Sequence, residues 1–336
     1  MILSNFAEVA PTAHAASSDC VPSDYNATVR PDEGVTTVEM AIYLIDVLDI
    51  KGANQSATVD FIFTEEWTDA RLAWGNSDDD RLDHCVVSVD QIWAPGVRLL
   101  NRRQLTSEEP ERVTIDRGGR VSYRQRYYGD ISMPLDLSNF PIDEQVLRFR
   151  YVSVGYGPDE VRLVVDRNNF GWSKNFSITE WSIGSPVSRS GQYHLPLRDR
   201  YLSELTFEFG AERQFGHYVM NYIFPLALIV MMSWAVFWID PSQLGIQTGL
   251  AASMMVTLVV FLYRLGLGLP KVAYITRMDI FIGVSIALVF LAFVEAIATG
   301  MLFKGGKEKL ALKIDRSARI GFPALFAALL VLFFLA

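Results

Sequence analysis

Side chains able to do covalent or metal chemistry are few and scattered in this sequence of 336 residues. The four histidines fall in unrelated contexts, and no two of them have the spacing of metal ligands. Gly266-Leu267-Gly268 follows no predicted strand, which disfavours a phosphate-binding loop. Acidic clusters such as Glu65-Glu66 and Asp78-Asp79-Asp80 are typical of a solvated face or loop. The sequence therefore predicts no enzyme, no cofactor and no metal site.

Four apolar runs near the C-terminus are long enough to cross a membrane. Residues 218–239 and 242–263 contain no charge, residues 280–303 contain only Glu295, and residues 320–336 contain none. About twenty helical residues span the roughly 30 Å hydrocarbon core of a bilayer. A mean hydropathy of +0.20 agrees with a membrane part. We expect a transmembrane domain over residues 213–336, with helices at about 217–239, 243–265, 278–303 and 318–336.

Charge divides the chain at the same place. Residues 1–212 hold 20 basic and 33 acidic side chains, a formal charge of −13, whereas residues 213–336 hold 10 and 5, a charge of +5. Six basic residues gather in the loop from Lys304 to Arg319, which predicts a cytoplasmic loop by the positive-inside rule. The acidic half and the C-terminus then lie outside. This charge pattern disfavours a nucleic-acid partner, and the apolar runs require membrane lipid.

The N-terminal half alternates apolar and polar residues in short segments rich in β-branched and aromatic side chains. The clearest segments are residues 38–44, 58–63, 120–124, 146–151 and 205–209. They predict an external, all-β, immunoglobulin-like sandwich over residues 21–212, after an N-terminal tail 1–20. Almost no linker joins it to the first helix, which favours signalling over passive anchoring. Cys20 and Cys85 are few for an exported domain, and we expect free thiols, with a bridge between them as the less favoured alternative.

Several short motifs occur in a fixed order along the chain. They are Trp67-Thr68-Asp69-Ala70-Arg71-Leu72, Ile92-Trp93-Ala94-Pro95, Phe140-Pro141-Ile142-Asp143-Glu144-Gln145, then Arg213, Pro225, Phe237-Trp238, and Leu269-Pro270-Lys271 with Tyr274 and Thr276. Together these motifs resemble those of the pentameric ligand-gated ion channels, the Cys-loop receptor superfamily. The resemblance covers roughly residues 35 to 300.

Two positions narrow the resemblance to one branch. The cysteines that close the family's F-P-F-D loop are replaced here by Met133 and Leu147. The chain is thus similar to prokaryotic members, which implies a multi-pass protein of the inner membrane with its sandwich and C-terminus in the periplasm. The resemblance also implies a homopentamer, in which four identical subunits are the partners of each chain. The alternative function is a non-conducting membrane receptor or assembly protein whose sandwich binds partners.

The resemblance makes the second helix the wall of the ion pore. Anchoring the register on Pro270 puts five residues on one helical face: Gly249, Ser253, Val256, Val260 and Tyr263. A narrow ring of valines would gate ions by expelling water. A competing register would instead line the pore with Gln247, Met254, Leu258 and Phe261. The acidic outer domain, with Asp240 at the cytoplasmic mouth, favours inorganic cations as the permeant ions.

A ligand site between neighbouring subunits and a coupling site at the membrane surface are further implications of the resemblance. Expected ligand-site residues are Phe61, Phe63, Tyr156, Tyr193 and Tyr201, with Arg124 or Arg126. Aromatic walls suit cations, arginines favour an anion such as a carboxylate, and titratable groups permit gating by protons. Expected coupling residues are Asp49, Pro141, Ile142, Asp143, Arg213, Pro270 and Lys271. Among them we expect an ion pair between Asp143 and Arg213, supported by Asp49.

Overall fold

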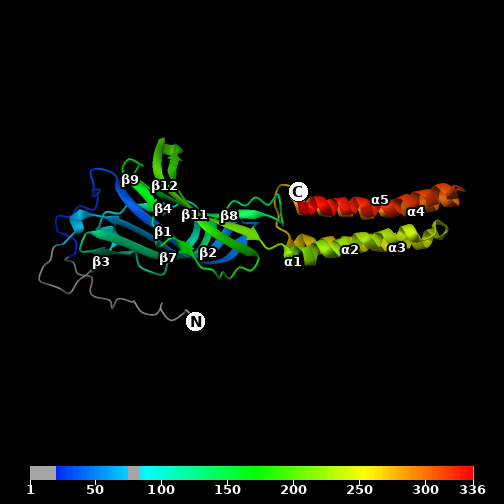
Figure 1. Ribbon diagram of the computed structural model, residues 1–336, viewed down its shortest axis with the longest axis horizontal. Coiled ribbons are helices and arrows are strands. Elements are labelled where there is room, and N and C mark those ends of the chain that lie inside the picture. Colours follow the sequence, from blue (N-terminus) through cyan, green and yellow to red (C-terminus); the bar gives the residue numbers. More distant parts are fainter. Residues whose placement is uncertain (1–19, 75–83, 336) are drawn as a thin grey trace.

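The protein is elongated, with a β domain at one end and a helical bundle at the other (Figure 1). The computed structural model describes residues 20–74 and 84–335. Most of the expected tail 1–20 therefore lies outside the described residues. The sandwich followed by four apolar helices confirms the predicted architecture. Only Gln214 and Phe215 separate the last strand from the first helix, so the two domains are joined almost without a linker.

The described strands form two packed sheets. The larger has eight strands, ordered β10-β1-β2-β7-β6-β3, with β5 paired to β7 and β9 to β1. The smaller has four, ordered β11-β12-β8-β4. The strands of the larger sheet are β1 (Thr36–Lys51), β2 (Ser56–Thr68), β3 (His84–Ser88), β5 (Arg102–Thr106), β6 (Arg112–Asp116), β7 (Arg120–Ser132), β9 (Val161–Val165) and β10 (Gly171–Trp172). Those of the smaller are β4 (Val97–Leu99), β8 (Glu144–Ser153), β11 (Trp181–Leu195) and β12 (Arg200–Arg213).

Alternating side chains from both sheets make the sandwich core. Phe61 of β2 meets Phe149 of β8 edge to face, with ring centroids 4.9 Å apart, and Phe149 meets Phe209 of β12 at 5.8 Å. All three rings are buried. Because successive side chains of a strand point to opposite faces, the same alternation sends Phe61, Phe63, Glu65 and Trp67 inward together.

Glu65 therefore contradicts the expectation of a solvated acidic pair. It is only 6% exposed, whereas its neighbour Glu66 is partly exposed and hydrogen-bonds to Arg120 and Ser122. Period-two alternation, applied through Phe61 and Phe63, would have assigned Glu65 to the buried face.

The tryptophan motif at the end of β2 ties the N-terminal segment to the sandwich. Asp69 accepts hydrogen bonds from Arg71 Nε at 2.8 Å and from the Tyr25 hydroxyl at 2.7 Å. Burial acts to raise the pKa of Asp69, but these hydrogen bonds outweigh it and hold the pKa below its usual value. The Tyr25 oxygen in turn accepts the Trp93 N–H at 3.0 Å. The motif thus satisfies buried polar groups from three separate segments.

A disulfide joins Cys20 to Cys85, so the expectation of free thiols is wrong. The bridge fastens the start of the described chain to β3, 65 residues further on. The sequence offered this bridge only as the less favoured alternative, because whether two cysteines 65 residues apart come together depends on the path of the chain between them.

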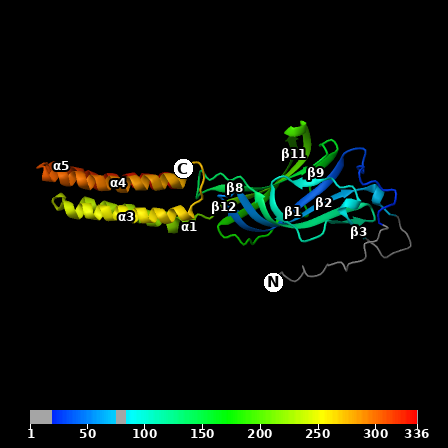
Figure 2. The same ribbon diagram turned by 180° about the vertical axis from the view of Figure 1, so that it is seen from behind.

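Four helical segments are long and apolar enough to cross a membrane: Gly216–Trp238, Pro241–Gly266, Arg277–Lys304 and Glu308–Leu335. The first joins α1 (Gly216–Tyr218), a π-helical turn, α2 (Phe224–Ser233) and a 3₁₀ turn. The others contain α3 (Leu244–Gly268), α4 (Arg277–Lys304) and α5 (Glu308–Leu335). The C-terminal end of α5 lies beside the β domain in both views, whereas the turn between α4 and α5 lies at the far end (Figures 1 and 2).

Two helix ends show how local sequence sets these bounds. Thr276 and Asp279 form a capping box at the start of α4, with the Thr276 N–H 2.9 Å from Asp279 Oδ2. The last helix begins at Glu308, whereas the sequence predicted a start near 318 after a loop from Lys304 to Arg319. That boundary was wrong because Glu308, Lys309, Leu310 and Ala311 are strong helix formers, and the helix extends beyond its apolar run.

Candidate channel and ligand sites

A buried ion pair lies where the sandwich meets the bundle. Arg213 Nε is 2.6 Å from Asp143 Oδ1, and Nη2 is 3.2 Å from Oδ2, so the contact is bidentate. The two side chains are 7% and 1% exposed. Gln145 donates a further hydrogen bond to Asp143 Oδ2 at 2.8 Å, and the Arg213 N–H donates to the Asp143 carbonyl at 3.2 Å. Three hydrogen bonds therefore join the end of β12 to the residue before β8, and the bond from Gln145 holds the Asp143 carboxylate in place.

Aromatic rings enclose the Arg213 guanidinium. Its central carbon lies 4.1 Å from the ring centre of Trp181 and 4.9 Å from that of Phe140, with Tyr218 of α1 at 5.8 Å. This cage was not foreseen, because Trp181 is far from Arg213 in sequence and faces it only through the pairing of β11 with β12. Within the described chain no ion pair joins Asp49 to Arg213, and Asp49 is exposed on β1.

The loop before β8 is bound to the linker between α3 and α4. The Leu137 N–H donates to the Tyr274 hydroxyl at 2.8 Å. Backbone N–H groups of Arg277 and Met278 donate to the carbonyls of Ser138 and Phe140, at 2.9 and 3.2 Å. The loop therefore touches the membrane domain mainly through Tyr274 and the start of α4.

Other expected coupling residues lie around this loop. Pro141 is buried, after a cis peptide bond from Phe140, and Ile142 is half-buried. Pro270 packs against the turn between β1 and β2. The contact is close enough that a methyl group added to Gly52 would lie 3.3 Å from Pro270 Cβ. Lys271 is exposed. The linker thus meets two loops of the sandwich, one at Pro270 and one at Tyr274.

The α3 helix has one exposed and one buried face in the single subunit. Gly249 and Ser253 are exposed, and the exposed fractions of Val256, Val260 and Tyr263 are 64%, 65% and 76%. By contrast, Gln247 is fully buried and its Nε2 donates to the carbonyl oxygen of Ile239 at 2.9 Å, while Leu258 is 1% exposed. The residues of the first predicted register are therefore exposed in one subunit, whereas two residues of the competing register, Gln247 and Leu258, are buried.

A cavity of about 310 Å³ lies inside the sandwich, and two expected ligand-site residues, Phe61 and Phe63, line it. Tyr123, Tyr127 and Tyr151 join them there. The ring of Phe63 stacks on that of Tyr151, with centroids 4.6 Å apart. Phe61 and Phe63 thus belong to a site within one subunit.

The remaining expected ligand residues lie elsewhere. Tyr156 accepts the indole N–H of Trp93 at 2.8 Å, and Tyr193 and Tyr201 lie on the hairpin of β11 and β12. Arg126 forms a two-point ion pair with Asp60, while Arg124 is exposed. The described structure thus places the expected set in four places: the cavity, the side chain of Trp93, the β11–β12 hairpin and strand β7. The described residues contain no group of three histidine, cysteine or acidic side chains that could hold a metal ion.

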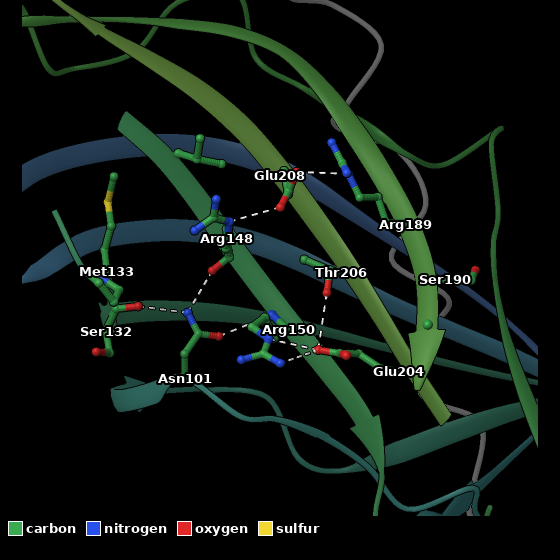
Figure 3. A pocket seen from close by; sticks show the side chains of 13 residues that line it. Asn101, Ser132, Met133, Arg148, Arg150, Arg189, Ser190, Glu204, Thr206 and Glu208 are labelled. Carbon is green, nitrogen blue, oxygen red and sulfur yellow. Dashed lines mark hydrogen bonds and ion pairs between the residues drawn. The ribbon is translucent and has the colours of Figure 1, made fainter. Parts of the chain in front are cut away.

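A second pocket, of about 500 Å³, lies on the smaller sheet (Figure 3). Three arginines and two glutamates line it. Arg148 and Arg189 both contact Glu208, at 3.0 and 3.3 Å. Arg150 contacts Glu204 at 2.8 Å. Each guanidinium is paired and at least 42% exposed, so this network is a solvated surface feature.

Comparison with known proteins identifies the architecture. Residues 17–215 match the neurotransmitter-gated ion-channel ligand binding domain, and residues 222–310 match the neurotransmitter-gated ion-channel transmembrane region. The chain belongs to the neurotransmitter-gated ion-channel family. A proton-gated ion channel of Gloeobacter violaceus is 26% identical over 292 residues, which cover 86% of this chain and 80% of the relative.

Membership of the neurotransmitter-gated ion-channel family confirms the resemblance read from the motifs. The chain is a multi-pass membrane protein and a subunit of an oligomeric, gated ion channel, in a family of channels and not of enzymes. The disulfide of this chain joins Cys20 to Cys85, whereas the positions of the family's loop disulfide hold the buried residues Met133 and Leu147.

Proposed function

We propose that five copies of this chain form a homopentameric, cation-conducting channel in the bacterial inner membrane, with α3 lining the pore. The exposure of α3 carries this proposal: the face of Gly249, Ser253, Val256, Val260 and Tyr263 is free in one subunit, as a pore face must be. Gln247 and Leu258, two residues of the competing register, pack inside the same subunit, which supports the first register.

The direction of the pore follows from the ends of the helices. Basic residues at the turn between α4 and α5, such as Lys304 and Lys307, favour the cytoplasmic side for that turn. The sandwich and the C-terminus then face the periplasm. Small Gly249 lies toward the cytoplasm and bulky Tyr263 toward the periplasm, with Val256 and Val260 as the hydrophobic constriction between them. No acidic side chain lies on this face, so cation preference depends on the acidic outer domain.

Opening by protons or by a small external ligand is part of the proposal. The relative from Gloeobacter violaceus is a proton-gated channel, which supports protons for this chain. For a ligand, the proposed wall between subunits includes Tyr156, Tyr193 and Tyr201, with Arg124 or Arg126 of the adjacent subunit. The ion pair of Arg213 with Asp143, with the loop at Pro141 and Ile142 and the linker at Pro270 and Lys271, would transmit the change to α3.

Cysteine substitution tests the pore face directly. Cys20 and Cys85 are bonded to each other, which favours a low background of thiol labelling. In proteoliposomes opened by a pH step, a cationic methanethiosulfonate reagent should block most of the current through Val256→Cys. The matched variant Leu258→Cys, two residues away, should be unaffected. The reverse pattern would support the competing register, and silence of wild type at every pH would favour a non-conducting receptor.

A further inference from the structure

The segment between the disulfide and β1 contains a short pattern that an oligosaccharyltransferase can recognise. Asn26-Ala27-Thr28 matches the N-x-[ST] acceptor pattern of N-linked glycosylation, which belongs on a surface loop of an exported domain. Asp24 adds a carboxylate two residues before the asparagine, a contact for a transferase with a basic peptide-binding groove. Residues 21–35 form turns and bends, so the pattern does lie in a loop.

The geometry of this loop presents the asparagine amide to solvent. Asp24, Asn26 and Thr28 are all exposed. The Thr28 hydroxyl donates to Asn26 Oδ1 at 2.7 Å, and the Thr28 N–H donates to the same oxygen at 2.9 Å, which makes an Asx turn. Both hydrogen bonds draw electron density from the amide and make its N–H protons easier to remove. Within the described residues the Asn26 Nδ2 donates no hydrogen bond, so this nitrogen is available for a new bond.

Two other asparagines carry the same three-residue pattern without this geometry. Asn54-Gln55-Ser56 ends in a serine that is 1% exposed and begins β2. In Asn175-Phe176-Ser177, the serine N–H and hydroxyl both donate to Asp46 instead of the asparagine. Two residues before these asparagines stand Gly52 and Ser173, and neither is acidic. The chain therefore contains one well-presented acceptor and two internal controls.

The loop is attached to the sandwich by groups other than the acceptor side chains. The Tyr25 hydroxyl binds Asp69, and Arg71 Nη1 donates to the Asn26 carbonyl at 3.4 Å. The start of the described chain, drawn in blue, lies at the end of the β domain away from the helices in both views (Figures 1 and 2). A group added there would project away from the membrane-spanning bundle.

We propose that Asn26 is an acceptor for an N-linked glycan, which a membrane-bound oligosaccharyltransferase transfers from a lipid diphosphate-linked oligosaccharide. The Asn26 Nδ2 attacks C1 of the first sugar, and the new N–C1 bond forms as the bond from C1 to the diphosphate oxygen breaks. The lipid diphosphate leaves with the electron pair, and one Nδ2 proton passes to a base of the transferase. The step needs no oxidant or reductant.

This site rests on the proposed periplasmic placement of the sandwich. The disulfide between Cys20 and Cys85 supports that placement, because such bridges form and persist in oxidising compartments such as the periplasm. The site does not depend on ion conduction.

Co-expression of the full chain with a bacterial oligosaccharyltransferase that requires an acid two residues before the asparagine tests the site. The chain carries a C-terminal tag, joined by a flexible glycine-serine spacer, with the same five residues Asp-Tyr-Asn-Ala-Thr. Mass spectrometry of the purified chain and its peptides should find two oligosaccharides, one on the tag and one on Asn26. Neither should appear when the transferase is inactive.

Matched variants locate the modification. Asn26→Gln should lose one of the two oligosaccharides, whereas Asn54→Gln and Asn175→Gln should keep both. Thr28→Ala should abolish modification at Asn26, and Thr28→Ser, which keeps the hydroxyl, should retain it. Asp24→Ala should lower the occupancy of Asn26 about tenfold, as for loss of a contact to a charged group. Because these changes at Asp24, Asn26 and Thr28 alter exposed side chains, the variants should elute like wild type in size-exclusion chromatography.

The tag separates failure of this site from failure of the proposed topology. A modified tag beside a bare Asn26 would overturn the site and leave the periplasmic placement standing. Full occupancy of Asn26 in Thr28→Ala would also overturn it, because the hydroxyl would then have no part in recognition. If the tag and Asn26 both stay bare, the proposed periplasmic placement fails and this site fails with it.

Discussion

Two carboxylates buried in the same sandwich, Asp143 and Glu65, have opposite surroundings. Asp143 is 3% exposed and is bound by Arg213 and Gln145. Glu65 is 6% exposed, and its Oε2 has no partner within the described chain. A buried charge is tolerated when it is paired and hydrogen-bonded, and otherwise it takes up a proton or a cation. Two equally buried carboxylates therefore differ in charge state: Asp143 is paired with a cation, whereas Glu65 tends to take up a proton.

Their positions in the molecule match this difference. Asp143 lies at the membrane end of β8, beside the point where β12 continues into α1, so it is placed at the covalent joint between the two domains. Glu65 lies in β2, beside a cavity within the sandwich. If the joint at Asp143 transmits movement, its loss should impair assembly and opening, whereas loss of the Glu65 carboxylate should alter how the subunit responds to pH.

Removing the guanidinium at the joint should have the largest effect. Arg213→Ala leaves Asp143 buried and unpaired, which should destabilise the subunit by about 3–5 kcal/mol. We expect little assembled channel at the membrane, measured by surface labelling and size-exclusion chromatography. Any channel that assembles should need a stronger stimulus to open.

Arg148→Ala is the matched control for this change. Arg148 is also paired with a carboxylate, Glu208, but it is 51% exposed, so its loss should cost at most about 1 kcal/mol. Normal currents and normal surface levels from Arg213→Ala would show that this buried ion pair contributes little to assembly or to opening.

The joint was predictable from the sequence, and the cavity was not. Asp143 and Arg213 were named together because each belongs to a motif of known order, and the predicted pair is present. Trp181, which covers Arg213, belongs to no such motif. Its strand, β11, has mostly exposed or half-buried residues and so lacks the alternation of apolar side chains that marks β2 and β8.

Glu65 shows a different limit of sequence analysis. Its identity as an acid suggested solvent, whereas its position two residues from Phe63 and two from Trp67 indicated the core. The prediction for Glu65 followed its residue type, which favours solvent. The alternation of β2 correctly indicates a buried position. The cavity itself required the pairing of β2 with β7 and the packing of β4 and β8 against them, which no local pattern contains.

Glu65 should make the free energy of unfolding of the subunit depend on pH. Folding raises the pKa of Glu65 from 4.5 to about 8, so between these values the folded chain holds a proton that the unfolded chain has lost. Stability of wild type should therefore fall as the pH rises through this window, and level off above it. Glu65→Gln removes this dependence, and should melt several degrees above wild type at pH 9 but close to wild type at pH 5.

Thermal unfolding followed by tryptophan fluorescence gives this measurement. Glu66→Gln should show the same pH dependence as wild type, because that residue lies on the other face of β2 and hydrogen-bonds to Arg120. A melting curve for Glu65→Gln that runs parallel to wild type from pH 5 to pH 9 would show that Glu65 already has a counter-charge in the assembled channel.

The smallest expected effect concerns the contact proposed to carry movement from the sandwich toward α3, the proposed pore helix. Tyr274→Phe removes the hydroxyl that accepts the Leu137 N–H at 2.8 Å, a neutral hydrogen bond worth about 0.5–1.5 kcal/mol. We expect normal assembly and a shift of up to about tenfold in the stimulus for half-maximal current. Tyr128→Phe, on an exposed part of β7, is the control and should not shift the response. If Tyr274→Phe gives the wild-type response, the sandwich transmits its movement through the backbone bonds of Arg277 and Met278 and not through this side chain.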